Sequence, residues 1–353
     1  EMCIRDRLGG AHADILTDGV QGFIMVGVGV LVAVLFCLGY GIEGGFDGMI
    51  SALGSQDENL VGWLNVTDVI YQSWWAVFAV FLAHVPLGML PHIGNKLWAL
   101  KEPTQRMQFI RLAFVFALIL AMLGFGGIMA RVILGEGIDS NQALALLFID
   151  LFPSWFAALL GVGILAAVMS TADGLVVSSS QIVANDLYRL SFVPRYRKDL
   201  SEEEIERRSL NISRISTVVI MILCTLLAWQ TLDMNVTILV WIGVGCMMAA
   251  FAGPLILGSV WSGVTKAGAF AGLLTGGGVY IITYLGVINP EWFGPGSLKD
   301  IALWLQRESP NPYSCAAMGE IASIAVTVVV SKLTAPYPKE HIDALFGKSV
   351  PTD

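Results

Sequence analysis

The sequence predicts an all-α polytopic membrane protein, and three observations support this fold class. Of the 353 residues, 56% are hydrophobic and only 14% are charged, whereas soluble domains usually carry about 25% charged residues. About eight apolar stretches are each long enough to cross roughly 30 Å of hydrocarbon as a helix. Glycine is frequent inside these stretches, as it is in membrane helices. We therefore expect the chain to be embedded in a lipid bilayer.

The expected membrane helices follow one another along the chain, joined by polar connections. They cover residues 20–42, 71–90, 112–133, 155–180, 212–231, 236–259, 267–288 and 316–334. Of the 20 Lys and Arg residues, all but Arg131, Lys299 and Arg307 fall on one set of alternating connections. Because basic residues are retained on the cytoplasmic side, we expect a multi-pass protein of the cell (inner or plasma) membrane with both ends in the cytoplasm.

The segments outside the expected helices divide the chain further. Residues 1–9 are polar and lack the apolar core of a signal peptide, so we interpret them as a fragment edge or scar. Residues 10–335 are expected to form one transmembrane domain, and residues 336–353 a cytoplasmic tail. In the polar connection at 181–211, Ser201 precedes the sequence EEEIERR and is expected to cap a short amphipathic helix.

Composition and motifs exclude several classes of protein. The net charge of −8, with no extended basic patch, argues against a nucleic-acid partner. The five cysteines have no CxxC spacing, which argues against a disulfide framework or a zinc site. No GxSxG or HExxH motif is present, and the four histidines lack the spacing of metal ligands. We therefore expect the chain not to be an enzyme.

The stretch from Gly163 to Arg189 places polar side chains inside an apolar segment. Ala167, Ser170 and Thr171 stand at positions i, i+3 and i+4, so they share one helix face. Two hydroxyls and nearby carbonyls can converge there, and oxygen ligands of this kind suit a hard cation such as sodium. Alternatively, the hydroxyls bond carbonyls of their own helix for packing alone. Asp173 favours the first interpretation, because an ionisable residue within a span is a functional candidate.

Asp18 lies where the first apolar run begins, and it has two interpretations. It is either an interfacial N-cap of that helix or a carboxylate on an ion path.

The expected helix at 71–90 and the one at 236–259 supply candidates for contact with a solute. Phe81 and His84 lie before Pro86, which should break the first of these helices and free backbone groups. Trp241 lies in the second helix, which Gly253-Pro254 should kink. The alternative is that these are kinked packing helices with a satisfied histidine.

Four motifs together resemble those of the sodium:solute symporter family. They are AAVMSTADGLVVSSSQIVANDLY at 166–188, TDGVQGFIM at 17–25, LPHIGNK at 90–96 and LGSVWSGVTKAGAFAGLLTGG at 257–277. The resemblance covers about residues 9–335. It implies a LeuT-like fold of two inverted repeats, with the first core helices missing from this chain.

The resemblance also implies which residues bind sodium. Ala167, Ser170 and Thr171 match the later-helix half of the family's sodium site, and Asp18 matches an aspartate near the intracellular sodium path. Asp173 and Ser170 are candidates for a second sodium.

The implied function is sodium-coupled symport of a small polar organic solute by alternating access. The alternative is a transporter-like membrane sensor domain. The expected partners are the solute, sodium and the lipid bilayer. The stretch at 81–90 is mostly apolar, which argues against a sugar.

Overall fold

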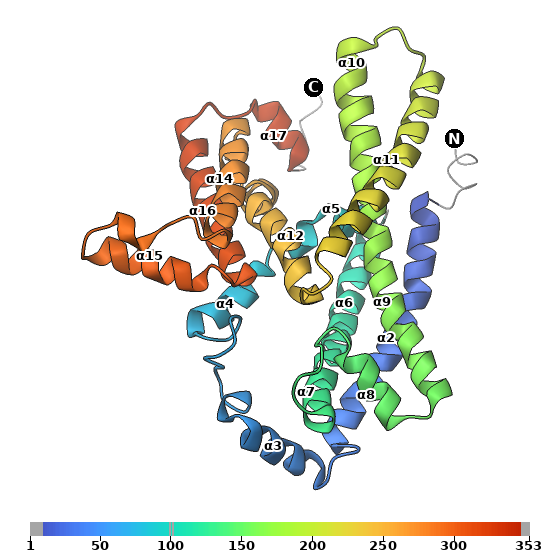
Figure 1. Ribbon diagram of the computed structural model, residues 1–353. Helices are drawn as coiled ribbons and strands as arrows, with labels where there is room; N and C mark the ends of the chain where they lie inside the picture. Colours follow the sequence, from blue (N-terminus) through green and yellow to red (C-terminus); the bar gives the residue numbers. More distant parts are fainter. Residues whose placement is uncertain (1–9, 99, 101, 347–353) are drawn as a thin grey trace. The chain divides into compact units, whose positions relative to one another are not determined.

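The structure is a computed structural model, and it describes residues 10–98, 100 and 102–346. Within these residues all regular structure is helical, which confirms the predicted all-α class (Figure 1). The chain divides into two compact units, Glu1–Gln56 with Pro91–Met234, and Asp57–Leu90 with Asn235–Asp353. The predicted edge segment 1–9 and residues 347–353 of the predicted tail lie outside the described residues.

Seven helices in the described part of the chain are long and apolar enough to cross a membrane, one fewer than predicted. They cover Leu16–Leu38, Thr104–Leu134, Ser154–Tyr196, Glu202–Gln230, Val236–Val260, Lys266–Tyr284 and Pro312–Leu333. The polytopic membrane class is therefore supported. The remaining predicted span, residues 71–90, differs from the prediction. It consists of α4 (Trp74–Ala83) and the 3₁₀ turn η2 (Leu87–Met89).

The break between α4 and η2 has a local cause in Pro86, as the sequence predicts. Proline has no N–H, and its ring clashes with the preceding turn of a helix. The amide of His84 bonds the carbonyl of Phe81 at 3.2 Å, a contact that tightens the last turn of α4. The imidazole Nδ1 of His84 bonds the carbonyl of Val80 at 2.5 Å. The histidine is therefore satisfied locally, and no continuous helix covers residues 71–90.

The first unit is built around two long antiparallel helices, α2 (Gly10–Leu38) and α9 (Ser154–Gln181) (Figure 1). Gly163 of α9 faces Val28 and Ile24 of α2, so the two backbones approach closely. An apolar cluster packs between the second half of α2 and the first half of α9. Its buried members are Val28, Val32, Phe148, Ala157 and Leu160. The other α-helices of this unit before α10 are α3 (Gly45–Gln56), α5 (Pro91–Trp98), α6 (Pro103–Ala121), α7 (Leu123–Leu134) and α8 (Ala143–Leu151).

The connection after α9 is more helical than predicted. The π-helix η3 (Ile182–Phe192) and α10 (Val193–Tyr196) continue directly from α9. Ser201 then caps α11 (Glu202–Gln230) by accepting the amide of Glu204, which confirms the predicted cap. The predicted short helix is wrong, because α11 runs without interruption into the next membrane span.

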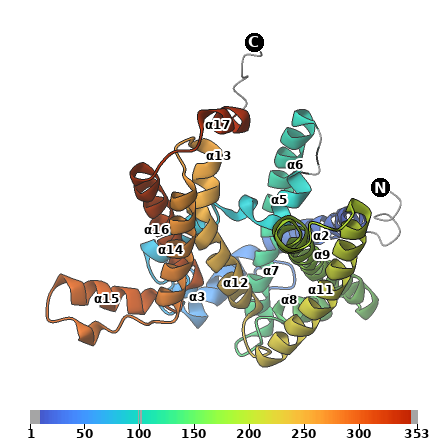
Figure 2. The same cartoon turned by 90° about the horizontal axis from the view of Figure 1, so that it is seen from above.

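The second unit is organised around α16 (Pro312–Leu333), which packs against α14 (Lys266–Tyr284) and α12 (Val236–Phe251). These three helices stand side by side when seen from above (Figure 2). The π-helix η4 (Ala252–Leu257) and α13 (Gly258–Val260) extend α12 past Pro254, where the sequence predicts a kink. The unit also contains α15 (Ser297–Glu308) and α17 (Lys339–Leu345).

Glycines allow the helices of the second unit to approach closely. A side chain at Gly272 of α14 would meet Thr327 Oγ1 of α16, and one at Gly276 would meet the backbone of Ala249. Gly268, nearer the start of α14, faces Ser331, nearer the end of α16. These contacts show that α14 and α16 are antiparallel, and small residues at spacings of four are typical of such close pairs.

Candidate functional site

The structure brings Ala167, Ser170 and Thr171 together on α9, as their spacing predicts. Ser170 Oγ donates to the carbonyl of Ala167 at 3.1 Å, and Thr171 Oγ1 donates to the same oxygen at 3.3 Å. This arrangement is common for hydroxyls in membrane helices. Each hydroxyl still has lone pairs that can accept or bind a cation. Ser170 is half-buried and Thr171 is exposed, so the role of these oxygens as sodium ligands stays a prediction.

Asp173 lies within the same candidate span, and its side chain is exposed. Among the described residues it makes no hydrogen bond or ion pair. A carboxylate in hydrocarbon is costly unless it faces a partner or a water-filled cavity. The exposed side of α9 at Asp173 is therefore a surface that must meet water, a cation or another protein segment.

Gln21 is a site residue that the sequence-based prediction missed. It lies two helical turns before Val28 on α2, and Ser170 lies two turns after Gly163 on α9. Because the helices are antiparallel and Gly163 faces Val28, Gln21 and Ser170 occupy facing sides at the same height. The Gln21 Oε1 atom is buried and has no hydrogen-bond partner among the described residues. Such an orphaned neutral oxygen fits a cation site.

Asp18 is half-buried and lies one turn before Gln21 on α2. Because α2 begins at Gly10, Asp18 is inside the helix, and the N-cap interpretation is wrong. The residues between Gly10 and Asp18 include Ala11, Ala13 and Leu16, all good helix formers, which explains why the helix starts earlier than predicted. The interpretation as a carboxylate on an ion path stays a prediction.

Two of the three predicted solute-contacting residues meet in the second unit. The rings of His84 and Trp241 have centroids 4.5 Å apart. Tyr313 completes the group, with centroids 4.3 Å from Trp241 and 6.0 Å from His84. Phe81 takes part in no ring contact of the described residues, and 72% of its surface is exposed. Tyr313 follows the turn signal NP at the start of α16, but its sequence position gave no reason to place it beside His84.

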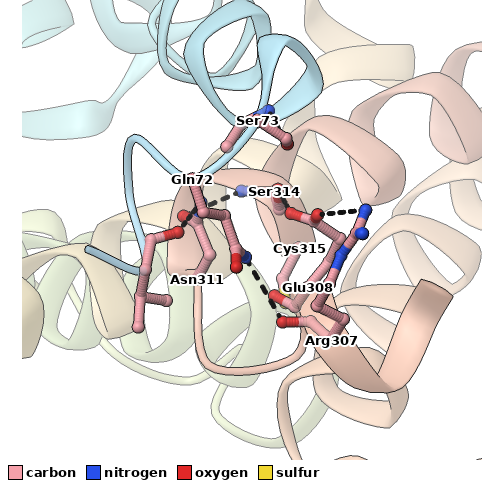
Figure 3. A network of polar contacts seen from close by, with 9 residues as sticks. Gln72, Ser73, Arg307, Glu308, Asn311, Ser314 and Cys315 are labelled. Carbon is pink, nitrogen blue, oxygen red and sulfur yellow. Dashed lines mark hydrogen bonds and ion pairs between the residues drawn. The ribbon is translucent and has the colours of Figure 1, made fainter. Parts of the chain in front are cut away.

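A buried polar network fixes the start of α16 and thereby the position of Tyr313 (Figure 3). Asn311 caps the helix, because its side-chain oxygen accepts the amides of Tyr313 and Ser314 at 3.0 and 3.2 Å. The carboxylate of Glu308 is fully buried and accepts the Ser314 hydroxyl at 2.7 Å. Arg307 Nη2 donates to the other Glu308 oxygen at 3.4 Å. This carboxylate is therefore paired, in contrast to Asp173.

The apolar spans, the hydroxyl pair on α9 and the broken helices are typical of a transporter, and a family comparison decides its kind. The model of the sodium:solute symporter family matches residues 2–276. The chain belongs to the sodium:solute symporter family. The family consists of transporters, which confirms that the chain is not an enzyme.

Curated relatives agree with this assignment. A sodium/pantothenate symporter of Haemophilus influenzae is 26% identical over 287 residues, which are 79% of this chain and 56% of the relative. The sodium/pantothenate symporter of Escherichia coli is 25% identical over 293 residues, or 81% of this chain and 56% of the relative. A sodium/proline symporter of Staphylococcus aureus is 25% identical over 328 residues, or 92% of this chain and 59% of the relative. This symporter-family chain thus spans little more than half the length of these relatives.

Proposed function

We propose that the chain forms part of a sodium-coupled symporter that carries a small polar organic solute across the cell membrane by alternating access. Membership of the sodium:solute symporter family supports this proposal. The relatives are named for pantothenate and proline, two small carboxylic acids. We therefore propose a small carboxylate as the solute.

The proposed architecture is LeuT-like, with both ends of the chain in the cytoplasm. The Lys- and Arg-rich connections all fall on one side of the membrane only if residues 71–90 also cross it. The break between α4 and η2 is compatible with this crossing, because irregular backbone is tolerated at membrane depth where protein or a water-filled cavity surrounds it. Discontinuous helices are also where transporters of this type bind their substrates.

One observation carries the proposed sodium site. The hydroxyls of Ser170 and Thr171 meet at the carbonyl of Ala167. The orphaned Oε1 of Gln21 belongs to the stretch of α2 that the contact of Gly163 with Val28 sets opposite Ser170. All of these donors are oxygens, as a hard cation requires. Asp18 and Asp173, near the same height of the helix pair, would line the path by which sodium enters or leaves.

The aromatic group of the second unit is the proposed solute contact. His84 and Trp241 supply it together with Tyr313, and Phe81 lies at the edge of the same broken helix. The Tyr280 hydroxyl fixes the backbone of Trp241, because it donates a hydrogen bond to the Trp241 carbonyl at 3.3 Å. Aromatic rings with a polar edge suit a small amphipathic solute.

Uptake measurements in proteoliposomes test the proposed sodium site. They use this chain and, in parallel, a chimera carrying the part of the Haemophilus influenzae symporter that the chain does not cover. We expect sodium-dependent uptake of labelled pantothenate or proline by the chimera and none by the chain alone. Ser170→Ala combined with Thr171→Ala should raise the sodium concentration for half-maximal uptake about tenfold, equivalent to roughly 1.4 kcal/mol.

The control variant is Thr225→Ala, which removes a hydroxyl that bonds a carbonyl of its own membrane helix α11. It should leave the sodium dependence unchanged. Gln21→Leu, which keeps a similar volume without the oxygen, should act like the double variant, and Asp173→Asn should lower the sodium-to-solute ratio. An unaltered sodium dependence in the double variant would refute the assignment.

A further inference from the structure

One face of α16 carries a row of polar side chains that the symport mechanism does not use. Glu320, Ser323, Thr327 and Ser331 stand at spacings of three and four, so they share one helix face inside a membrane span. Their exposed surfaces are 2%, 0%, 0% and 5%. Because they are buried within the second unit itself, other protein segments and lipid do not reach them.

The members of this face differ in their partners. Ser331 Oγ accepts the amide of Thr265 at 3.1 Å, and Ser323 Oγ accepts the amide of Gly253 at 3.0 Å. Glu320 Oε1, by contrast, is buried without a hydrogen-bond partner among the described residues. A carboxylate left in this way is far more costly than a hydroxyl, because its charge is not balanced.

No lysine or arginine of the neighbouring helices is placed to balance that charge. Lys332 lies twelve residues further along α16, which is about 18 Å of helix. Lys266 lies at the same end, because α14 is antiparallel to α16 and Gly268 faces Ser331. Arg307 lies thirteen residues before Glu320 and is paired with Glu308.

The remaining titratable groups on the packed helices are uncharged or distant. They are Cys246 on α12, Tyr280 and Tyr284 on α14, Tyr313 and Cys315 on α16, and His84 at the end of α4. His84 contacts Tyr313, which precedes Glu320 by seven residues, or about 10 Å of helix. Its Nδ1 is engaged with Val80.

We propose that Glu320 is a proton-binding site, occupied whenever α16 is packed against α12 and α14. When the helices dock, the Glu320 carboxylate takes one proton from water and becomes the neutral acid. When they separate, the proton returns to water. Neutralisation is the outcome expected for a buried carboxyl without a cation, because burial of the isolated ion costs much more.

This site connects proton binding to the broken helix. Ser323 lies one turn after Glu320 and bonds both sides of the junction between α12 and η4, at Ala250 and at Gly253 just before Pro254. A movement that lifts this part of α16 from α12 and η4 would break these bonds, expose Glu320 and free its proton. The proposal does not depend on sodium coupling, since it rests on the packing of the second unit alone.

Infrared difference spectroscopy of the full chain in lipid nanodiscs at neutral pH tests the proposal. Subtracting the spectrum of Glu320→Gln from that of the wild type should leave the carbonyl stretch of a protonated carboxyl and no carboxylate bands. The matched control is Glu308→Gln, because Glu308 is equally buried but bonded to Ser314 and Arg307. Its difference spectrum should contain carboxylate bands.

A second measurement covers folding of the variant. Glu320→Gln places a neutral group of the same shape at the site, so its thermal stability at neutral pH should match that of the wild type. Carboxylate bands from Glu320 would overturn the proposal and indicate a bound metal cation instead. A Gln variant that fails to fold would also overturn it, because a neutral acid is replaced well by its amide.

Discussion

Ser323 bonds the backbone on both sides of the junction between α12 and η4. Its replacement by alanine would measure how much these two contacts stabilise the protein. Pro254 has no N–H to donate to the carbonyl of Ala250, four residues earlier. Ser323 Oγ donates to that carbonyl at 3.4 Å and accepts the amide of Gly253 at 3.0 Å. Because Ser323 is completely buried, water cannot take over either contact once the hydroxyl is removed.

The expected loss of stability follows from these two contacts. A buried polar group left without its partner costs about 1–3 kcal/mol. The contact to the Ala250 carbonyl is long and therefore weak, so its loss adds a cost near the lower limit of this range. We expect Ser323→Ala to lower the free energy of unfolding by about 2–4 kcal/mol. Reversible unfolding in mixed detergent micelles measures this quantity.

Two further variants make the experiment decisive. Ser259→Ala removes an exposed hydroxyl that bonds the Ile256 carbonyl of its own helix, and it should cost less than about 0.5 kcal/mol. Pro254→Ala supplies the missing N–H, so in that background Ser323→Ala should cost about 1 kcal/mol less. The reasoning is refuted if Ser323→Ala matches the wild type, or if its cost is the same in both backgrounds.

Two other predictions use the same unfolding measurement. Gly272→Ala should destabilise the protein by about 1–3 kcal/mol, because its Cβ would press on Thr327 Oγ1, whereas Gly278→Ala meets no atom within 4 Å and should be neutral or stabilising. Equal stabilities of these two variants would contradict the close packing. Asn311→Ala should cost about 1–2 kcal/mol through loss of the cap. Asn311→Ser keeps a capping oxygen without adding a charge and loses the 3.0 Å bond to the Val69 carbonyl, so a cost as large as that of alanine would show that the cap is unimportant.

Local patterns made much of this architecture predictable. Length and hydropathy identify the spans, since each needs about 20 apolar residues. Pro86 predicts the break after α4, because the missing N–H acts within one turn. The meeting of Ser170 and Thr171 at Ala167 follows from helical spacing alone. Each of these inferences depends on residues at most one or two turns apart.

Non-local contacts were beyond the same reasoning. Gln21 becomes a candidate ligand only when the crossing point of α2 and α9 is known, because Gly163 and Val28 set their relative height. Tyr313 joins His84 through the packing of helices that are far apart in the sequence. The start of α2 differs from the prediction for another reason, because the first turns of the helix are polar and the apolar run begins later.

The glycine contacts of α14 also identify a fixed frame of reference for following motion. Gly268, Gly272 and Gly276 leave no room for α14 to slide or rotate against its neighbours α16 and α12. As long as these contacts persist, the three helices move as one body and bending is concentrated elsewhere. Spectroscopic labels placed on the outer faces of α14 and α16 would then report a constant separation, and this separation can calibrate every other distance measured in the working protein.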